Sequence, residues 1–379
     1  MTGDDESLAD VEPGAVDDEQ LATLEMAQTA PHPDDPRKPQ HVRQIGFASW
    51  RYVFKRAWWK FLTDLDMDQA GALTYYAILS IFPALLALVS TLGVLGQGRA
   101  ATDWLIGFLA RHAPADVVDL LRGPISNLAS QQGAGLVLIV SLVIAVFSAS
   151  GYVAAFGRSL NKIYGVAEGR PIWKVIPYNL LLTVLTLLLG AGAMLAVLLS
   201  GGVARALGDA VGLGAEAQGL WAVAKWPVLG VTAIVYMSLV YYATPNVRQP
   251  RFRWITVGSV LALAVMAVAV FGFTQYVINF GTFNATYGAI GSVTVLLLGT
   301  WLVNVALLFG AEVDAELERV RELQGGLEAE EQIQLPPRDD RMIKENARVQ
   351  QRLIDQARQI RERYADVDYP RPLRRRARD

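Results

Sequence analysis

The longest uncharged stretch of the chain runs for 58 residues, from Trp254 to Ala311, without one Asp, Glu, Lys or Arg. A hydrocarbon core of about 30 Å is crossed by roughly 20 helical residues, so this stretch holds two crossings and a short turn. The turn is expected at residues 279–287, where Asn, Thr and Gly gather. The chain is therefore predicted to be an integral membrane protein built around this helical hairpin.

Charge is distributed unevenly along the chain. Residues 1–36 carry 11 acids and no Lys or Arg, whereas residues 37–60 carry seven bases and no acid. The net charge of −2 averages over these blocks and gives no clue to a partner. The chain has no cysteine, which excludes disulfides, thiolate metal sites and cysteine nucleophiles. Because the acidic N-terminus lacks a basic segment followed at once by an apolar one, no cleavable signal peptide is expected.

Apolar segments predict an all-α fold with six membrane-spanning helices. Their expected bounds are about 70–95, 134–157, 175–200, 226–244, 254–278 and 288–311, within a membrane domain over residues 65–320. Lys and Arg gather before the first span and in the connections between spans two and three and spans four and five. The positive-inside rule therefore places both termini in the cytoplasm, and the even number of spans agrees.

Three segments flank this domain. Residues 1–40 are acidic and poor in apolar residues, so they are expected to be disordered. Residues 41–64 predict an amphipathic helix in the membrane interface, although a helix packing on a partner is the alternative. The residues expected to meet anionic lipid headgroups on the cytoplasmic face are Trp50, Arg51, Lys55, Arg56, Trp58 and Lys60.

The last segment, residues 321–379, is expected to be a cytoplasmic tail with a charged amphipathic helix at 341–364 and a basic end. Such a helix either associates with a second copy of the chain or lies on the bilayer. Basic ends also occur in nucleic-acid-binding proteins, but in a membrane protein a topology or lipid signal is favoured. Membrane lipids and a homo-oligomer are thus the expected partners, and nucleic acid is not.

Polar residues in or near the apolar spans form the candidate site, because a polar group in hydrocarbon must be satisfied. The candidate cavity or gating residues are Asp68, Arg158, Asn161, Asn304, Glu312 and Asp314. The charged ones all belong to the cytoplasmic end, so a cluster around Arg158 could gate a cavity or hold a headgroup phosphate. The alternative is that Asp68 stabilises a helix start, that Glu312 and Asp314 are solvated, and that Asn304 makes an interhelical hydrogen bond.

At the opposite end, the hairpin turn carries a second set of polar residues. Asn279, Asn284 and Tyr287 suit the outer interface and are the candidate outer mouth of a path. The arm from Tyr287 to Glu312 is expected to line the centre of the bundle.

The sequence offers no pattern for metal or cofactor chemistry. Metal-dependent hydrolysis needs clustered His and carboxylate ligands. The three histidines, His32, His41 and His112, are far apart, and no Gly-rich phosphate-binding motif ending in Lys-Ser or Lys-Thr is present. No metal, cofactor or catalytic residue is therefore expected.

Several separated motifs of the membrane domain are distinctive. They are residues 68–83 (DQAGALTYYAILSIFP), residues 158–164, Ala243-Thr244-Pro245-Asn246, Tyr287-Gly288-Ala289-Ile290-Gly291, Trp301 and Gly310-Ala311-Glu312. Together they resemble the YihY/BrkB family of bacterial inner-membrane proteins over roughly residues 45–320. The resemblance implies a six-helix fold with cytoplasmic termini, located in the bacterial cytoplasmic (inner) membrane. Members of that family have been called virulence-associated, mislabelled as ribonuclease BN, and suggested to move lipids, and no agreed catalytic residues exist to carry over.

Two functional hypotheses follow. The first is a non-enzymatic protein that moves a lipid or another anionic or amphipathic envelope component. The second is an envelope scaffold or lipid-sensing protein whose helix at 341–364 and basic end recruit partners or sense anionic lipid. A polar cavity or lateral groove would favour the first, and a solid bundle would count against it.

Overall fold

The computed structural model describes residues 17–94, 134–198, 215–252, 254–279 and 283–364, together with a few single positions between 106 and 123. Its nine α-helices over these residues confirm the all-α fold. They are α1 (Asp18–Thr29), α2 (Phe47–Thr63), α3 (Asp66–Val94), α6 (Ala134–Tyr164), α7 (Ile172–Leu198), α9 (Ala215–Ala243), α10 (Val257–Asn279), α11 (Phe283–Gln324) and α12 (Arg341–Arg363), with one short 3-10 helix, η2 (Val42–Gln44).

The long helices coincide with the predicted spans. Five segments are long and apolar enough to cross a membrane: Leu142–Tyr164, Ile172–Gly190, Gly219–Ala243, Val257–Val277 and Val293–Gln324. The first predicted span coincides with α3, whose side chains from residue 81 onward lie outside the described part. Five predicted spans are thus confirmed, whereas the first span and the side of the membrane on which the termini lie stay predictions.

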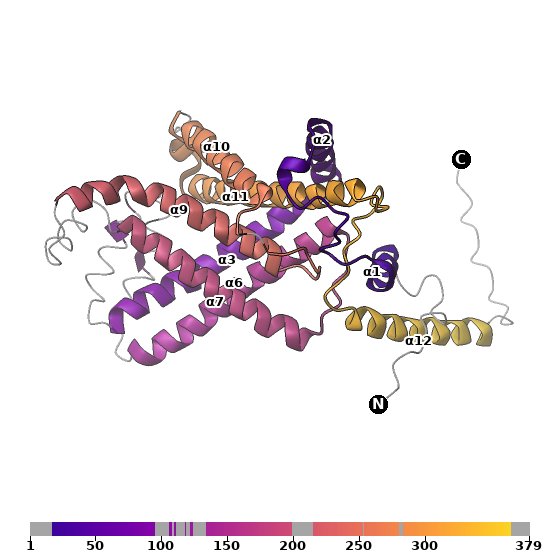
Figure 1. Cartoon of the computed structure of the whole chain (residues 1–379). Helices are drawn as coiled ribbons and strands as arrows, with labels where there is room; N and C mark the ends of the chain where they lie inside the picture. The colour runs from indigo at the N-terminus through magenta and orange to yellow at the C-terminus, as the bar shows by residue number, and fades with distance from the viewer. Residues whose placement is uncertain are drawn as a thin grey trace, which may run out of the picture.

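Helix α11 lies in the middle of the bundle and contacts α2, α3, α6 and α10 (Figure 1). Its 42 residues span about 63 Å at 1.5 Å per residue, which is twice the thickness of a hydrocarbon core. Val293 and Leu296–Leu298 are exposed, whereas Ala306, Leu308 and Ala311 are fully or almost fully buried. Only the second half of the helix therefore lines the centre of the bundle, whereas the sequence predicted this for the whole arm from Tyr287 to Glu312.

Two glycines allow α10 and α11 to approach closely. A Cβ atom on Gly258 would overlap the carbonyl oxygen of Gly310 and the carboxylate of Asp314. Gly258→Ala is therefore expected to destabilise the membrane domain by about 1–3 kcal/mol, because the two helices must separate. A lower apparent melting temperature of the purified protein in detergent would show this effect.

Gly272, on the same helix, is the matched control. A Cβ atom there would meet nothing within 4 Å. Gly272→Ala should leave stability unchanged or raise it by about 0.5–1 kcal/mol, because alanine restricts the unfolded chain. Equal melting temperatures for the two variants would contradict the close contact at Gly258.

The N-terminal segment differs from the disorder expected for residues 1–40, because residues 17–40 are ordered. The carboxylate of Asp17 accepts a hydrogen bond from the Gln20 backbone amide at 2.8 Å and caps α1. Leu24 and Met26 are buried. The segment is too polar to form its own core, but it needs none because it packs on the end of the membrane domain (Figure 1). Composition alone does not reveal such a surface.

The predicted interfacial helix at 41–64 is present as α2, and it lies across α11 (Figure 1). Val53, Ala57 and Phe61 are buried, and this face belongs to the protein core. Trp58 is 57% exposed, so one face of the helix is free of protein. The helix thus packs on the protein by one face, as in the alternative interpretation, and keeps an aromatic face outside.

The linker between α11 and α12, residues 325–340, is part of the core. Ala329, Ile333 and Leu335 are almost fully buried. The charged helix predicted at 341–364 is confirmed as α12, and Ile343 in its first turn is buried. Farther along α12 an apolar stripe is exposed, formed by Val349, Leu353, Ile360 and Tyr364.

Candidate functional site

One end of the bundle carries most of its buried charge. This charged end is where α3, α7 and α10 begin, α6 and α9 end, and residues 312–324 of α11 lie. Six ionic residues of α11 are at most 6% exposed there: Glu312, Glu316, Glu318, Arg319, Arg321 and Glu322. The interpretation of Glu312 as solvated is therefore wrong. Helix α2 and residues 17–45 and 327–340 cover this part of α11, because ion pairs and apolar contacts hold them on it.

Two bases of α2 face this acidic segment. The Nε atom of Arg56 lies 3.1 Å from a carboxylate oxygen of Glu316. The Nζ atom of Lys60 lies 3.4 Å from Asp64 and 3.6 Å from Glu312. Arg56 and Lys60 were predicted to meet lipid headgroups, and this is corrected: their helical phase directs them to α11.

The remaining headgroup-facing predictions fall on exposed or partly exposed positions. Arg51, Lys55 and Trp58 are exposed on α2, and Trp50 is partly buried. The Trp50 ring stacks on Phe54 with 5.9 Å between ring centroids. Their contact with lipid headgroups stays a prediction.

The acid at the start of α3 that belongs to the site is Asp66 and not Asp68. Asp66 is fully buried, whereas Asp68 is exposed. Burial, and then the charge of Asp64, raise the pKa of Asp66 to about 7. Helical spacing could have indicated this residue, because Asp66, Ala70 and Leu73 fall on one face of the helix.

Asp66 and Glu312 face one another across α3 and α11. The carboxyl groups of Asp66 and Glu312 are close enough to influence each other electrostatically. The Oδ2 atom of Asp66 and both carboxylate oxygens of Glu312 are buried and receive no hydrogen bond among the described residues. The Nε2 amide of Gln69 donates to the other oxygen of Asp66 at 3.2 Å. Three acceptor atoms are thus held away from water without a donor.

The cluster predicted around Arg158 does not form. Arg158 is exposed on α6, and within the described ranges no acid forms an ion pair with it. The positions on either side, Gly157 and Ser159, belong to the buried face. Because successive helical residues are rotated by 100°, Arg158 is directed away from α11. The cations that pair with the acids of α11 are instead Lys60 and Arg56.

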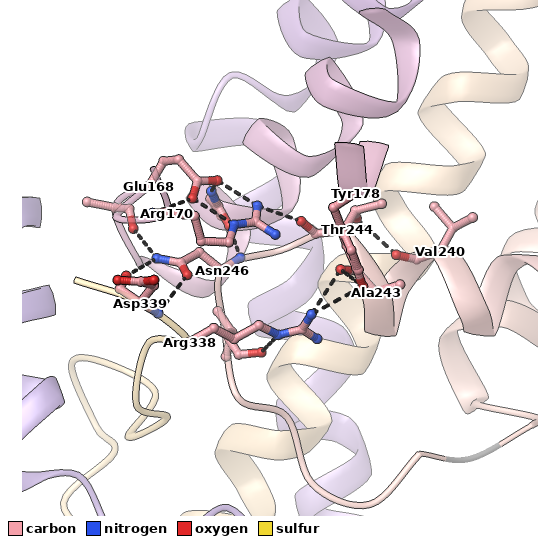
Figure 2. A network of polar contacts seen from close by, with 12 residues as sticks. Glu168, Arg170, Tyr178, Val240, Ala243, Thr244, Asn246, Arg338 and Asp339 are labelled. Carbon is pink, nitrogen blue, oxygen red and sulfur yellow. Dashed lines mark hydrogen bonds and ion pairs between the residues drawn. The ribbon is translucent and has the colours of Figure 1, made fainter. Parts of the chain in front are cut away.

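Asn161 belongs to a different polar network, which Figure 2 shows around Asn246. Its side-chain oxygen accepts the backbone amide of Asn246 at 2.6 Å, and its side-chain amide donates to Glu168 at 3.0 Å. The Asn246 side chain in turn donates to the carbonyls of Ala167 and Asp339 and accepts the Asp339 amide at 3.1 Å. The two asparagines thereby join the loop after α6, the end of α9 and the linker before α12.

Arg338 closes the end of α9 in the same network. Its guanidinium donates to the carbonyls of Tyr242 and Ala243, the last two residues of that helix (Figure 2). It also lies over the Tyr242 ring, 5.5 Å from the centroid. A cation at a helix C-terminus satisfies free carbonyls and complements the helix dipole. Sequence reasoning missed Arg338 because nothing in the sequence of residues 325–340 indicated where its side chain would lie.

Asn304 makes the predicted interhelical hydrogen bonds. The hydroxyl of Tyr152 donates to its side-chain oxygen at 2.8 Å, and its amide donates to the Thr74 hydroxyl at 3.1 Å. Asn304 is 1% exposed. It therefore joins α11 to α6 and α3 in the interior of the bundle.

Asp314 accepts the backbone amide of Gly258 at 2.7 Å and so caps the start of α10. It also lines a pocket of about 110 Å³ at the charged end, between α9, α10 and α11. The polar residues of the pocket wall are Tyr164, Ser238, Tyr241, Tyr242, Gln249, Arg251, Thr256, Asp314, Glu318 and Arg321.

An apolar groove of about 400 Å³ lies between α2 and α10. Apart from Thr256, its lining is apolar and includes Phe54, Val260 and Leu261. Residues 255–257 line both the groove and the pocket. The pocket, which has charged and hydroxyl side chains in its wall, and the apolar groove therefore meet at the start of α10.

The predicted outer mouth falls largely outside the described residues. Asn279 ends α10, and Asn284 and Tyr287 lie in the first turns of α11, but the structure does not describe these side chains. The prediction about them stays untested. In the part of the chain that is described, no group of three or more His, Cys, Asp or Glu residues could hold a metal ion.

Comparison with known proteins gives consistent matches. The family described as Virulence factor BrkB matches residues 57–333. The ribonuclease-like protein YfkH of Bacillus subtilis (strain 168) is 28% identical over 256 residues, which cover 68% of this chain and 91% of that protein. No solved structure matches the chain.

Two relatives from Xanthomonas are named UPF0761 membrane proteins. Those of Xanthomonas campestris pv. campestris (strain B100) and Xanthomonas axonopodis pv. citri (strain 306) are each 30% identical over 274 residues. These residues are 70% of this chain, but they span only 60% of the length of either relative. The match to residues 57–333 covers nearly three quarters of the chain, and it includes the end of α2, the bundle and the first part of the buried linker. The chain therefore belongs to the Virulence factor BrkB family of membrane proteins.

Proposed function

We propose that this chain is a non-enzymatic membrane protein that moves an anionic, amphipathic envelope component, such as a lipid. The observation that supports the proposal is the junction, at residues 255–257, of a pocket that has charged side chains in its wall and an apolar groove. A molecule with a charged headgroup and an acyl chain needs two such surfaces side by side. Binding sites commonly combine apolar walls with a few polar groups that fix the orientation of the ligand.

The pocket has one cation available for an anionic headgroup. Arg321 is engaged by Glu318 and by the carbonyl of Pro39. Arg251 is exposed, and its guanidinium has no ion-pair partner in the described ranges. The backbone amide of Arg251 donates to Asp34 at 3.0 Å, which fixes this loop. A guanidinium binds phosphate oxygens with charge-assisted hydrogen bonds, so Arg251 is the residue that we expect to hold the headgroup.

The proposed topology completes this function. We propose six spans, with α3 as the first, in the bacterial cytoplasmic membrane and with the charged end in the cytoplasm. The loop charges support this orientation through the positive-inside rule. The pocket then lies at the inner surface, and the groove beside α2 faces the acyl chains of the inner leaflet. The exposed aromatic and basic residues of α2 suit the interface.

Liposome reconstitution tests the proposal. Vesicles with a fluorescent anionic phospholipid would report its movement between leaflets, with wild type compared with Arg251→Ala. We expect about a tenfold slower rate for the variant, because one charged hydrogen bond contributes about 1.5–3 kcal/mol. Equal rates for wild type and protein-free vesicles would end the transport proposal.

Arg158→Ala is the matched control in this assay. It removes an exposed arginine that does not line the pocket. It should keep the wild-type rate. Equal losses in both variants would assign the effect to net charge and not to the pocket.

The scaffold hypothesis is supported by the exposed stripe of α12, formed by Val349, Leu353, Ile360 and Tyr364. A truncation after residue 340 removes this helix but keeps the buried linker and Arg338. In the same assay, the truncated protein should move lipid at the wild-type rate. A loss of transport with the bundle intact would favour a role for α12 in the function.

A further inference from the structure

We propose that Asp66 and Glu312 form a proton-binding site, in which the two buried carboxyl groups share one proton between α3 and α11. The site is separate from the pocket at Arg251, because neither residue lines that pocket or the apolar groove. The inference goes beyond the proposed transport and does not depend on it.

The first argument is the unmet hydrogen-bonding capacity of the pair. Asp66 and Glu312 are fully buried, and three of their four carboxylate oxygens receive no hydrogen bond among the described residues. A buried acceptor without a donor is costly, and native structures rarely keep one. A proton on one carboxyl group turns that group into a donor, and the other group becomes its acceptor. One shared proton therefore gives two of the three oxygens a hydrogen bond, and Lys60 lies 3.6 Å from the Glu312 carboxylate.

The second argument is the balance of charge. Glu316, one turn after Glu312, is already paired with Arg56 at 3.1 Å and with Arg319 at 2.9 Å. Arg56 and Arg319 thus neutralise Glu316. Only one base of α2 forms an ion pair with Glu312, in the preceding turn of α11, among the described residues.

That base is Lys60, and it serves more than one acid. Its Nζ atom lies 3.4 Å from Asp64 and 3.6 Å from Glu312, and it also donates to the Ile163 carbonyl at 3.0 Å. Within the described ranges, Asp66 forms no ion pair. Two ionised carboxylates in contact, away from water and with one shared lysine, would leave a negative charge uncompensated. Neutralisation by a proton removes that cost, as in other close carboxyl pairs.

Charged and titratable groups face the pair from every helix packed around it. They are Arg56, Lys60 and Asp64 from α2, Lys162 and Tyr164 from α6, and Glu316 and Arg319 from α11. The bases favour the ionised form and the acids oppose it. Burial and the charge of Asp64 prevail, so the pKa of Asp66 is raised to about 7.

The site links proton binding to the packing of α3 on α11. With the proton bound, the two carboxyl groups hold the start of α3 against α11 by a hydrogen bond. Without it, two like charges face one another in a medium of low dielectric constant and push these helices apart. Leu65, just before Asp66, has φ 61°, a left-handed conformation that β- and γ-substituted residues rarely adopt. The repulsion that follows release of the proton would thus act on the strained turn at Leu65, between α2 and α3.

The experiment is a pH series of apparent melting temperatures for the full-length protein in detergent. An acid whose pKa is higher in the folded state than in the unfolded state stabilises the fold at low pH, and this contribution is lost as the pH rises through the folded pKa. The wild type should therefore lose stability as the pH rises through about 7. Asp66→Asn mimics the protonated form and should reduce the slope of this loss by about one proton.

Asp68→Asn is the matched control, since it removes an exposed acid two positions farther along α3. It should keep the wild-type slope. Infrared difference spectra of the wild type between low and high pH provide a measurement that needs no variant. They should show a carboxylic-acid carbonyl band that disappears as the pH rises. A wild-type slope in Asp66→Asn, or the absence of that band, would overturn the proposal.

Discussion

Replacement of Lys38 by Met is expected to destabilise the charged end by about 3–5 kcal/mol, because it leaves buried carboxylates without their cation. Lys38 is 1% exposed, and its Nζ atom lies 3.0 Å from Glu318 and 3.1 Å from Glu322. Glu318 keeps Arg321 as a partner, but Glu322 loses its only ion pair in the described ranges. Met keeps the apolar part of the side chain, so the loss is mainly electrostatic.

The effect of Lys38→Met should extend to both flanks of the membrane domain. Glu322 also accepts the backbone amide of Gln334 at 2.7 Å, so one carboxylate joins the N-terminal segment to the C-terminal linker. A lower apparent melting temperature and faster protease cleavage within residues 17–45 would show the change. The control is Arg37→Met, because the Arg37 side chain is 56% exposed and pairs with Asp35 alone. Similar proteolysis rates for the two variants would contradict the structural role of Lys38.

Asn246→Ala is the second variant with a large expected effect, about 3 kcal/mol or more. It removes three side-chain hydrogen bonds and leaves partly buried backbone groups of Ala167 and Asp339 unpaired. Each unsatisfied buried group costs about 1–3 kcal/mol. The loop after α6 and the linker before α12 should then separate from the end of α9. Hydrogen exchange of residues 165–171 and 336–340 would measure this loosening directly.

Two further variants test whether the loss of stability comes from the hydrogen bonds of the Asn246 side chain. Asn246→Asp keeps the oxygen that accepts the Asp339 amide but loses both donated bonds, so its effect should be intermediate. Arg248→Ala lies two positions away and removes only an exposed contact of 3.5 Å with the Arg338 carbonyl. It should be nearly neutral. An Arg248→Ala effect as large as that of Asn246→Ala would assign the loss to the whole loop and not to the asparagine.

The uncharged runs predicted the long helices because hydrocarbon excludes charge and unpaired backbone, and this constraint acts on each segment separately. Five spans are confirmed in this way, and the amphipathic pattern located α2 and α12. Asn304 was also predicted correctly, since a lone amide within an apolar span must find a partner on another helix. The family resemblance agreed with the match over residues 57–333.

The candidate site was predicted only in part. The sequence indicated an acidic end on α11 and bases near it, but it assigned Arg158 as the central cation and Asp68 as the acid of α3. Helix phase and packing select Lys60 and Asp66 instead. The same limit applies to Arg338 and Lys38, because a base in a polar segment is indistinguishable in sequence from a solvated one.

The sequence by itself determined that the chain is a helical membrane protein, where its long helices lie and to which family it belongs. Only the tertiary structure decided that residues 17–45 and 327–340 cover the charged end, and which acids and bases are buried there. The physical reason is that membrane insertion depends on the composition of one segment. Burial of a charge depends on partners that lie up to 284 positions away in the chain, as Lys38 and Glu322 do.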